Sequence, residues 1–460
     1  MKPILLVANR GEIACRVIRA AKKLSLRTVA VYSEADAELP HVRLADEAIL
    51  LGPARASESY LQTEKLLSAA RQTDASLLHP GYGFLSENAA FANACESAGI
   101  NFVGPTAEVI SMMGDKDEAR QAAARAGVPI VPGTGKLDVT DAAAIKAAGE
   151  RTGFPLLVKA AAGGGGIGMR TVSNPEELAA AVQATSGMAQ KAFGDGSVYL
   201  ERYVQRARHV EIQLFGFGDG TAVHLFERDC SLQRRHQKVV EEARAPLIAD
   251  EVRQKIAAAA VALACACRYR GAGTVEFLYD THTQAFYFLE MNTRIQVEHP
   301  VTEMITGVDL VGAQLRLAMG ERLQQELAQS RIVANGHAVE AWVYAENPAK
   351  NFLPSPGLLS EFKLPEGEGI RVDTGYREGN KVTPFYDPMI MKVIAHGATR
   401  ELAIDRLQDA LGRLHIAGIT HNTGYLQSVL RHPGFRGADL HTGFLGAVHS
   451  QLFSSVQMVG

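Results

Sequence analysis

The sequence predicts an α/β fold: a parallel sheet at the N-terminal end, a central α/β domain with a mobile glycine-rich lid, and an α+β C-terminal domain. Three observations favour this organisation. Strand and helix patterns alternate over the first hundred residues. Four consecutive glycines at 163–166 separate two predicted strands. Two later strands, 273–280 and 288–298, carry polar side chains at every second position.

The N-terminal segment alternates short apolar strands with helices. The predicted elements are strands 4–8, 27–32, 76–79 and 101–104, with helices 12–24 and 87–97. One glycine follows the first strand where a dinucleotide fingerprint has three, which argues against a nicotinamide site. Loops after parallel strands carry ligands, so His79–Ser86 is a candidate wall of a binding site. A tight turn without a ligand is the alternative.

A glycine-rich loop follows Lys159, the last residue of the predicted strand 154–159. Before it, a predicted helix over 112–127 carries Lys116, and 128–135 is a predicted hinge-like linker. Each loop glycine costs roughly 1 kcal/mol relative to alanine, so packing does not explain four of them. We expect a flap whose N–H groups close over phosphate, and a loop without function is the alternative. The chain has no Gly-x-x-x-x-Gly-Lys-Ser/Thr motif, which argues against a P-loop.

A strand with one polar face is predicted where His209, Glu211 and Gln213 alternate with apolar residues. The densely charged segment Glu227–Lys238 follows it. Cys230 lies in this segment close to a histidine, an arrangement that could indicate a nucleophile. A semi-buried thiol without chemistry is the preferred interpretation, because no oxyanion-hole element accompanies it.

The strands 273–280 and 288–298 are predicted to pair as a hairpin across the turn-like segment 280–284, with Glu276 and Glu290 facing each other. Consecutive polar groups on the second strand then stand about 7 Å apart. Carboxylates and a carboxamide are hard oxygen ligands of the kind Mg²⁺ takes when it holds nucleotide phosphates. The arginine on this face offers an anion-binding fork, and the last glutamate is a possible base. A solvated edge strand is the alternative.

The C-terminal part is predicted as an α+β domain after a boundary near Arg331. It follows an alanine-rich buried helix over 251–268 and a helix from Pro300 to Met319, and includes a strand over 386–393 and a helix from Thr399. The predicted domains are 1–113, 114–330 with a lid at about 131–204, and 331–446, followed by a tail at 447–460.

Bulk properties exclude several classes of protein. With 460 residues, 47% apolar composition and a net charge of −3, the chain has no basic run for nucleic acid. No apolar stretch approaches the roughly 20 residues of a membrane span. The segment 4–8 is a predicted strand, not the apolar region of a secretory signal. The five cysteines lack zinc-site spacing, and their odd number argues against a disulfide framework. A cytoplasmic location is therefore expected.

Four strings resemble biotin carboxylase, the ATP-dependent component of biotin-dependent carboxylases such as the alpha subunit of an acyl-CoA carboxylase. They are Ala8–Ala14, His79–Asn88, Glu227–Lys238 and Glu290–Pro300, and the likeness extends from residue 1 to about 445. The resemblance implies a Rossmann-like pre-ATP-grasp domain, an ATP-grasp domain and a C-terminal domain. It also implies a homodimer that works with a biotin carboxyl carrier and a carboxyltransferase.

The resemblance also implies the site residues. Those for ATP are Lys116, Lys159, Gly164, Gly165, Gly166, Met169, Glu201, His209, Gln233, His236, Glu276, Leu278 and Glu290. Two Mg²⁺ or Mn²⁺ ions are implied on Glu276, Glu290 and Asn292. Bicarbonate would be held by Arg294, Gln296, the Val297 N–H and Lys238, with Glu298 as its base. Biotin would contact Tyr82 and the residue at position 342.

The implied chemistry starts when deprotonated bicarbonate attacks the γ-phosphate of ATP to give carboxyphosphate. Carboxyphosphate breaks down to CO₂ and phosphate, the phosphate takes the N1 proton of biotin, and the ureido anion captures CO₂. That anion needs a cationic donor beside it. No biotinyl-lysine domain with a Met-Lys-Met centre follows residue 445, so the carrier is expected on another chain or on a removed downstream segment.

Four positions depart from the family pattern. Trp342 replaces the arginine that stabilises the biotin enolate, Ile167 replaces an arginine in the flap, and Arg244 replaces a proline. Met391 is bulkier than the small residue usual before Lys392. Two alternatives remain open: an ATP-grasp ligase that passes carboxyphosphate to another acceptor, and a nucleotide-binding subunit without activity. The intact acidic residues Glu276, Glu290 and Glu298 argue against the second.

Overall fold

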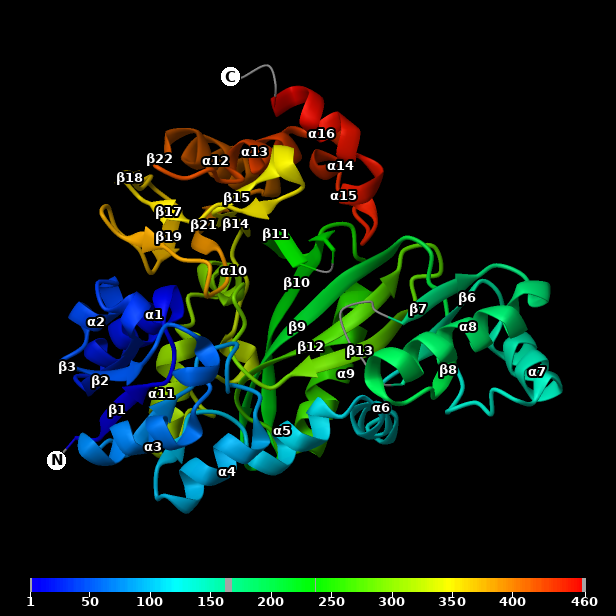
Figure 1. Cartoon of the computed structure of the whole chain (residues 1–460), viewed down its shortest axis with the longest axis horizontal. Helices are drawn as coiled ribbons and strands as arrows, with labels where there is room; N and C mark the ends of the chain where they lie inside the picture. The colour runs from blue at the N-terminus through cyan, green and yellow to red at the C-terminus, as the bar shows by residue number, and fades with distance from the viewer. Residues whose placement is uncertain (1, 162–167, 236, 457–460) are drawn as a thin grey trace.

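The structure is a computed structural model that describes residues 2–161, 168–235 and 237–456. Figure 1 shows an N-terminal α/β part in blue, a long green sheet through the middle, and C-terminal helices in orange and red. A smaller α/β unit projects to one side of the green sheet. Residues Gly164, Gly165, Gly166, Ile167 and His236, for which the sequence predicts roles or departures, lie outside the described residues.

The N-terminal sheet is parallel, as predicted, with the strand order β3-β2-β1-β4-β5. Its strands are β1 (Ile4–Val7), β2 (Arg27–Ser33), β3 (Glu47–Gly52), β4 (Leu77–His79) and β5 (Asn101–Phe102). The helices of this part are α1 (Gly11–Lys23), α2 (Pro40–Leu44), α3 (Thr63–Gln72) and α4 (Ala89–Ser97). The sequence analysis missed α2, β3 and α3. Most β3 side chains are only half-buried, because β3 is an edge strand, so its apolar signal is weak.

An eight-stranded sheet runs through both the central and the C-terminal parts, in the order β13-β12-β9-β10-β11-β14-β21-β19. All its pairs are antiparallel. The central strands are β9 (Ala207–Phe217), β10 (Ala222–Arg234), β11 (Gln237–Ala243), β12 (Arg270–Asp280) and β13 (Phe286–Asn292). The C-terminal strands are β14 (His337–Tyr344), β19 (Ile370–Thr374) and β21 (Met389–Gly397). Because β11 pairs with β14, the C-terminal part continues the central sheet.

The projecting unit is a three-stranded antiparallel sheet, β7-β6-β8, covered by two helices (Figure 1). Its elements are α7 (Ala142–Thr152), β6 (Leu156–Ala160), β7 (Met169–Val172), α8 (Pro175–Phe193) and β8 (Val198–Arg202). The strands predicted on either side of the glycine run are confirmed. Isolated bridges join Ile130 to Phe288 and Gly133 to Glu201, so the predicted linker contacts both this unit and the central sheet.

Two predicted helices are divided in the structure, and one predicted strand ends early. The predicted helix over 112–127 is two helices, α5 (Ala107–Gly114) and α6 (Lys116–Arg125), because the Asp115 side chain caps α6. The helix after Pro300 is likewise divided into α10 (His299–Thr306) and α11 (Leu310–Ala318). The predicted strand 288–298 is wrong beyond Asn292, where β13 ends and an irregular segment leads into α10.

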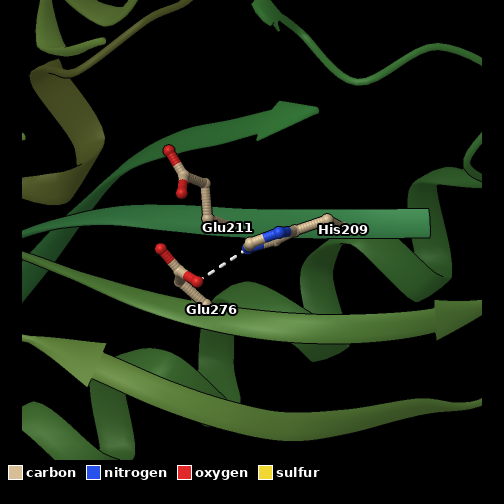
Figure 2. Close-up of side chains that lie close together, drawn as sticks. All are labelled: His209, Glu211 and Glu276. Atoms are coloured by element: carbon tan, nitrogen blue, oxygen red, sulfur yellow. Dashed lines mark ion pairs between the residues drawn. The ribbon is translucent and has the colours of Figure 1, made fainter. Parts of the chain in front are cut away.

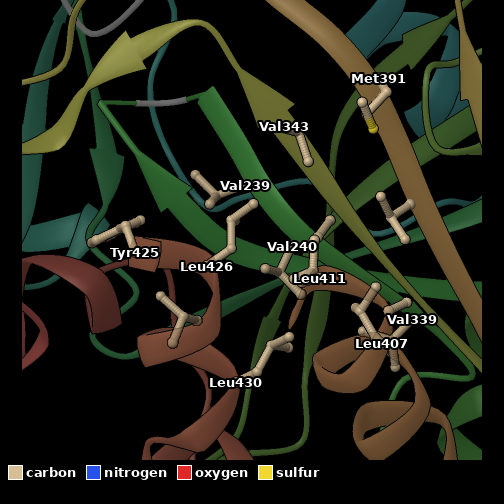
Figure 3. Packing of buried hydrophobic residues seen from close by; sticks show 14 of the residues in the cluster. Val239, Val240, Val339, Val343, Met391, Leu407, Leu411, Tyr425, Leu426 and Leu430 are labelled. Carbon is tan, nitrogen blue, oxygen red and sulfur yellow. The ribbon is translucent and has the colours of Figure 1, made fainter. Parts of the chain in front are cut away.

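The C-terminal core packs helices against one face of the long sheet (Figure 3). Val240 of β11, Val339 of β14 and Met391 of β21 contribute to it, opposite α12 (Arg400–Arg413) and α13 (Thr423–Arg431). The unusual Met391 is completely buried in this core. Since neighbouring strand residues point to opposite faces, Lys392 points to the other side, and its Nζ lies 2.6 Å from the Val297 carbonyl oxygen. The departure at 391 therefore fills the core and not the site.

The remaining elements are short or flank these layers. They are α9 (Asp250–Ala266), β15 (Glu346–Asn347), β16 (Leu353–Pro354), β17 (Gly357–Leu358), β18 (Glu361–Lys363), β20 (Lys381–Val382), β22 (His415–Ala417), α14 (Pro433–Arg436), α15 (Phe444–Ala447) and α16 (His449–Val456). The expected tail is thus helical as far as Val456, and Leu452 is buried in the C-terminal core.

Replacement of Arg400 by Met is expected to lower the free energy of unfolding by about 3–5 kcal/mol, because it leaves the buried Glu242 carboxylate without its partner. Arg400 joins α12 to β11: its Nε and Nη2 lie 2.5 and 2.9 Å from the two Glu242 oxygens. Urea denaturation measures the loss. The control is Arg413→Met, which removes an exposed pair with Asp409 and should change stability by about 0.5 kcal/mol or less. Equal losses in the two variants would contradict the assignment.

No helix among the described residues is long and apolar enough to cross a membrane. All five cysteines are free, in line with the expectation that they form no disulfide framework. Cys230 is completely buried, deeper than the semi-buried thiol expected, and burial raises the pKa of its thiol well above the usual value. Burial and a raised pKa both argue against a nucleophilic role for Cys230, since the thiolate is the reactive form.

Candidate active site

A polar cavity of about 540 Å³ lies over the β9–β12–β13 end of the long sheet. It brings together most of the residues that the sequence analysis singled out. The predicted residues that line it are Met169, His209, Gln233, Lys238, Glu276, Glu290, Asn292, Arg294, Gln296, Val297, Glu298 and Trp342.

The predicted hairpin forms the floor of this cavity. Glu276 of β12 and Glu290 of β13 are paired across it, as expected. Glu276 is buried, and it accepts hydrogen bonds from Asn292 Nδ2 at 2.8 Å and Gln296 Nε2 at 3.0 Å. Burial opposes the ionisation of Glu276, but Lys238 and His209 outweigh it and lower the pKa of this carboxyl. Glu276 is therefore an anion that faces a second carboxylate, Glu290, whose side chain is exposed.

A cluster of charged side chains connects β9 to this hairpin (Figure 2). His209 Nε2 lies 2.7 Å from Glu276 Oε2. Burial lowers the pKa of His209, but Glu276 more than compensates and raises it overall. Glu211 points toward the same space, and the ligand atoms of His209, Glu211 and Glu276 lie within 4.8 Å of one another, close enough for a metal ion. Both Glu211 oxygens are already held by protein cations, Oε1 by Arg228 at 2.5 Å and Oε2 by Lys238 at 2.8 Å.

The residues predicted to hold Mg²⁺ fit a hard cation in part. Glu276 and Glu290 offer carboxylate oxygens from facing positions of the hairpin. Asn292 turns its amide nitrogen to Glu276, and its Oδ1 accepts a hydrogen bond from Arg294 Nη2 at 3.1 Å. Glu276, Glu290 and Asn292 remain the proposed ligands, and Asn292 also orients Glu276 through its hydrogen bond.

The residues predicted to bind bicarbonate surround Lys238 and the segment after β13. Lys238 Nζ contacts Glu298 directly and lies 3.4 Å from Glu276 Oε1. Arg294 Nε donates to Glu87 Oε2 at 2.9 Å, which fixes the guanidinium against the loop after β4. Lys392 donates to the carbonyl oxygen of Val297, as described above. The proposed base therefore lies beside a partly buried ammonium group.

Two predicted ATP residues pair with each other outside the cavity lining. Lys159 Nζ lies 2.5 Å from Glu201 Oε2, and Arg120, which the sequence analysis did not single out, also contacts Glu201. Lys116 begins α6 and lines a smaller cavity of about 190 Å³ beside Glu290. Leu278 of β12 is half-buried and lies opposite His209 in register.

An aromatic cavity of about 540 Å³ adjoins the polar one. The two share Arg294, Val297, Trp342, Tyr344 and Asp387. Its other aromatic lining residues are Tyr82, Phe84, Tyr376, Phe385 and Tyr386. Both residues predicted to contact biotin, Tyr82 and Trp342, thus line this cavity.

The indole N–H of Trp342 is already engaged. Trp342 Nε1 donates at 3.0 Å to Oε1 of Glu340, a buried carboxyl group that lines neither cavity. Burial raises the pKa of the Glu340 carboxyl to about 8, although the neighbouring Lys392 lowers it. Arg244 does not take the place of the missing arginine. Arg244 follows Ala243, and Ala243 pairs with Ala338 of β14. Ala338 lies roughly 13 Å along that strand from Trp342.

The sequence analysis did not assign roles to several residues of this network. Glu211 belongs to the polar alternation of β9 and Arg228 to the charged segment of β10, so the sequence pattern marked both as candidate site residues. No sequence pattern separates Glu12 and Lys392 from other charged residues. In the structure, however, Lys392 Nζ lies 3.1 Å from Glu12 Oε1, and Tyr82 donates a hydrogen bond to the same oxygen.

Three family models match the chain in order. The model described as "Biotin carboxylase, N-terminal domain" matches residues 1–110. The model described as "Carbamoyl-phosphate synthase L chain, ATP binding domain" matches residues 115–326. The model described as "Biotin carboxylase C-terminal domain" matches residues 340–447.

Close relatives cover nearly the whole chain. Biotin carboxylase 2 of Bacillus subtilis is 49% identical over 441 residues, which are 96% of this chain and 98% of that protein. The mitochondrial methylcrotonoyl-CoA carboxylase subunit alpha of Glycine max is 47% identical over 449 residues, 98% of this chain and 61% of that protein. The biotin carboxylase domain dimer of Hydrogenobacter thermophilus 2-oxoglutarate carboxylase was solved with MgADP, ADP and bicarbonate. It matches with a TM-score of 0.89 and 44% identity over 98% of this chain and 99% of that one.

Proposed function

The chain belongs to the biotin carboxylase family, and from this premise we propose that it carboxylates biotin with ATP and bicarbonate through carboxyphosphate. The observation that carries the proposal is the contact of Glu298 with Lys238 in one cavity with the facing pair Glu276 and Glu290. This arrangement combines a base, a cation for an anionic substrate and ligands for a divalent ion.

Bicarbonate binds against Lys238, Arg294, Gln296 and the Val297 N–H. Glu298 removes its proton, and the resulting oxygen anion attacks the γ-phosphorus of ATP as the bond to the ADP oxygen breaks. The product is carboxyphosphate. Catalysis of this step consists of positioning and charge neutralisation, because phosphoryl transfer needs little covalent chemistry from the protein.

ATP lies between the projecting unit and the hairpin, with its phosphates near Lys116 and Lys159. The residues proposed around the nucleotide also include Met169, Glu201, His209, Gln233 and Leu278. Glu276, Glu290 and Asn292 would hold Mg²⁺, which would supply positive charge to neutralise the phosphate oxygens. Asn292 and Gln296 keep the Glu276 carboxylate in place through the hydrogen bonds described above. Lys159 must leave Glu201 to reach a phosphate, since the two are paired in the structure.

Carboxyphosphate breaks down to CO₂ and phosphate, and the phosphate takes the N1 proton of biotin so that the ureido nitrogen attacks CO₂. We propose that the ureido ring enters through the aromatic cavity, between Tyr82 and Trp342. The biotin is carried on a biotin carboxyl carrier, and a carboxyltransferase uses the product.

The proposal also includes domain boundaries near residues 113 and 330, a homodimer, and a cytoplasmic location. Five free cysteines suit a reducing compartment.

The test measures ADP release from Mg-ATP with and without bicarbonate, and with and without free biotin. We expect bicarbonate to stimulate ADP release and carboxybiotin to form from labelled bicarbonate. A chelator such as EDTA should abolish both. ADP release that responds to bicarbonate but yields no carboxybiotin, even at high biotin concentration, would favour a different acceptor. The absence of any response to bicarbonate would contradict the proposal.

A further inference from the structure

Arg228 of β10 is a completely buried arginine at the centre of a hydrogen-bond network beneath the polar cavity. A guanidinium has five N–H donors, and the structure gives each of them an acceptor. Nε donates to Glu211 Oε1 at 2.5 Å, Nη1 to Gln213 Oε1 at 2.6 Å and Thr302 Oγ1 at 2.9 Å, and Nη2 to Gln296 Oε1 at 2.7 Å and Thr274 Oγ1 at 3.2 Å.

The network reaches two residues of the bicarbonate subsite by separate routes. Arg228 holds Gln296 directly. It also holds one oxygen of Glu211, whose other oxygen accepts from Lys238 Nζ at 2.8 Å. Lys238 and Gln296 line the cavity, whereas Arg228 itself does not. We propose that Arg228 is a positioning residue that orients Gln296 and Lys238 together and thereby sets the affinity for bicarbonate, an inference that rests on the proposed function.

The contact between Arg228 and Gln296 determines the orientation of the Gln296 amide. Because Oε1 accepts from Arg228, the Nε2 group must turn the other way, where it donates to Glu276 Oε1 at 3.0 Å. Gln296 thereby presents a donor and not an acceptor on the Glu276 side of the cavity, as an anionic substrate requires. Without Arg228 the amide has no reason to keep this orientation.

The contact with Glu211 acts on Lys238 in the same manner. Glu211 is completely buried, and its charge is compensated from one side by Arg228 and from the other by Lys238. If Arg228 is lost, the whole Glu211 carboxylate is available to Lys238 and draws the ammonium group toward β9. Lys238 then turns away from Glu298 and from the place proposed for bicarbonate.

Arg228→Lys is the first test, because lysine has a point charge and three donors where the site uses a planar fork with five. We expect the KM for bicarbonate to rise about tenfold to a hundredfold, the scale of a lost hydrogen bond to a charged group. The KM for ATP should rise less than the KM for bicarbonate, since Arg228 contacts no residue proposed to touch ATP and reaches Glu276 only through Gln296.

Arg208→Lys is the matched control. Arg208 is also almost completely buried, on the adjacent strand β9, and it binds Asp229 Oδ2 at 2.9 and 2.7 Å and the Pro246 carbonyl oxygen at 2.6 Å. None of these partners is proposed to touch substrate. We expect Arg208→Lys to destabilise the protein as Arg228→Lys does but to leave the bicarbonate KM within about twofold of its original value.

The double variant Arg228→Met with Glu211→Gln separates folding from positioning. Removal of both buried charges avoids an unpaired ion, so its thermal stability should recover relative to Arg228→Met alone. Its bicarbonate KM should stay raised about tenfold or more, because Gln296 and Lys238 still lack their orienting partners.

The outcomes are distinct. Provided that the unmodified protein responds to bicarbonate, three results would overturn the inference and leave the proposed function standing. They are an unchanged bicarbonate KM in Arg228→Lys, an equal rise of that KM in Arg208→Lys, and a bicarbonate KM that recovers together with stability in the double variant. If the unmodified protein shows no bicarbonate-dependent ADP release, the proposed function fails and the inference falls with it.

Discussion

Glu298→Gln is expected to retain nucleotide binding and to slow bicarbonate-dependent ATP cleavage by about two or more orders of magnitude, the usual scale for a lost acid–base group. Glutamine keeps the size of the side chain and cannot accept the bicarbonate proton. Glu298 is 2% exposed, lines the polar cavity and contacts Lys238, so it is placed to act on an anion beside that ammonium group. Steady-state ADP release and nucleotide titration measure the two quantities.

Glu303→Gln is the control for this substitution. Glu303 is a buried glutamate on α10, a few residues further along the chain. It forms ion pairs with Arg16 at 2.8 Å and with Arg371 at 2.7 Å. It lines neither cavity. We expect Glu303→Gln to lower stability and to leave the rate of ATP cleavage per folded molecule nearly unchanged. Turnover of Glu298→Gln at the rate of the unmodified protein would remove Glu298 from the mechanism.

Trp342→Arg is expected to raise biotin-dependent turnover by about two to three orders of magnitude and to leave ATP binding nearly unchanged. A preorganised donor to a developing anion contributes roughly 3–4 kcal/mol to the transition state. The indole cannot supply it, because its only N–H donates to Glu340. A guanidinium at the same place has donors for both Glu340 and the ureido oxygen. Carboxylation of free biotin from labelled bicarbonate measures the effect.

Trp342→Phe serves as the matched control, since it keeps an aromatic ring on the cavity wall and removes the N–H. We expect it to carboxylate biotin as slowly as the unmodified protein, because the N–H it lacks was bound to Glu340 and not to substrate. If the unmodified protein already carboxylates biotin briskly and Trp342→Arg slows it, Trp342 belongs to an altered acceptor pocket. The family mechanism at the biotin end would then be wrong for this chain.

Local patterns predicted elements well where burial was strong. The strands β1, β2, β4, β9 and β12 follow apolar or alternating runs, and the structure confirms them. The edge strand β3 and helix α3 were missed because their burial is partial. The polar alternation from Glu290 to Glu298 was extended too far. A period of two describes any extended backbone, and only the absence of a pairing partner beyond Asn292 ends the strand there.

The sequence by itself determined the chemistry at the hairpin. Glu276 and Glu290 face each other because the turn after Asp280 pairs Tyr279 with Phe286, and a bulge between Glu276 and Phe277 then shifts the register by one residue. Both features lie within this one hairpin. The identity of the proposed base, cations and metal ligands followed from residue types along one segment. The absence of an arginine at position 342 was likewise visible in the printed sequence.

Only the tertiary structure decided how these groups are held. Arg228 reaches Gln296 and Thr302 across about 70 residues of chain, and Lys392 reaches Val297 and Glu12 from a strand of the C-terminal part. Such partners depend on the order β9-β10-β11-β14-β21, which places distant strands side by side. Residue spacing carries no information about that order. Hence the sequence predicted that Trp342 lacks a guanidinium, and the fold determined that its remaining N–H is already bound to Glu340.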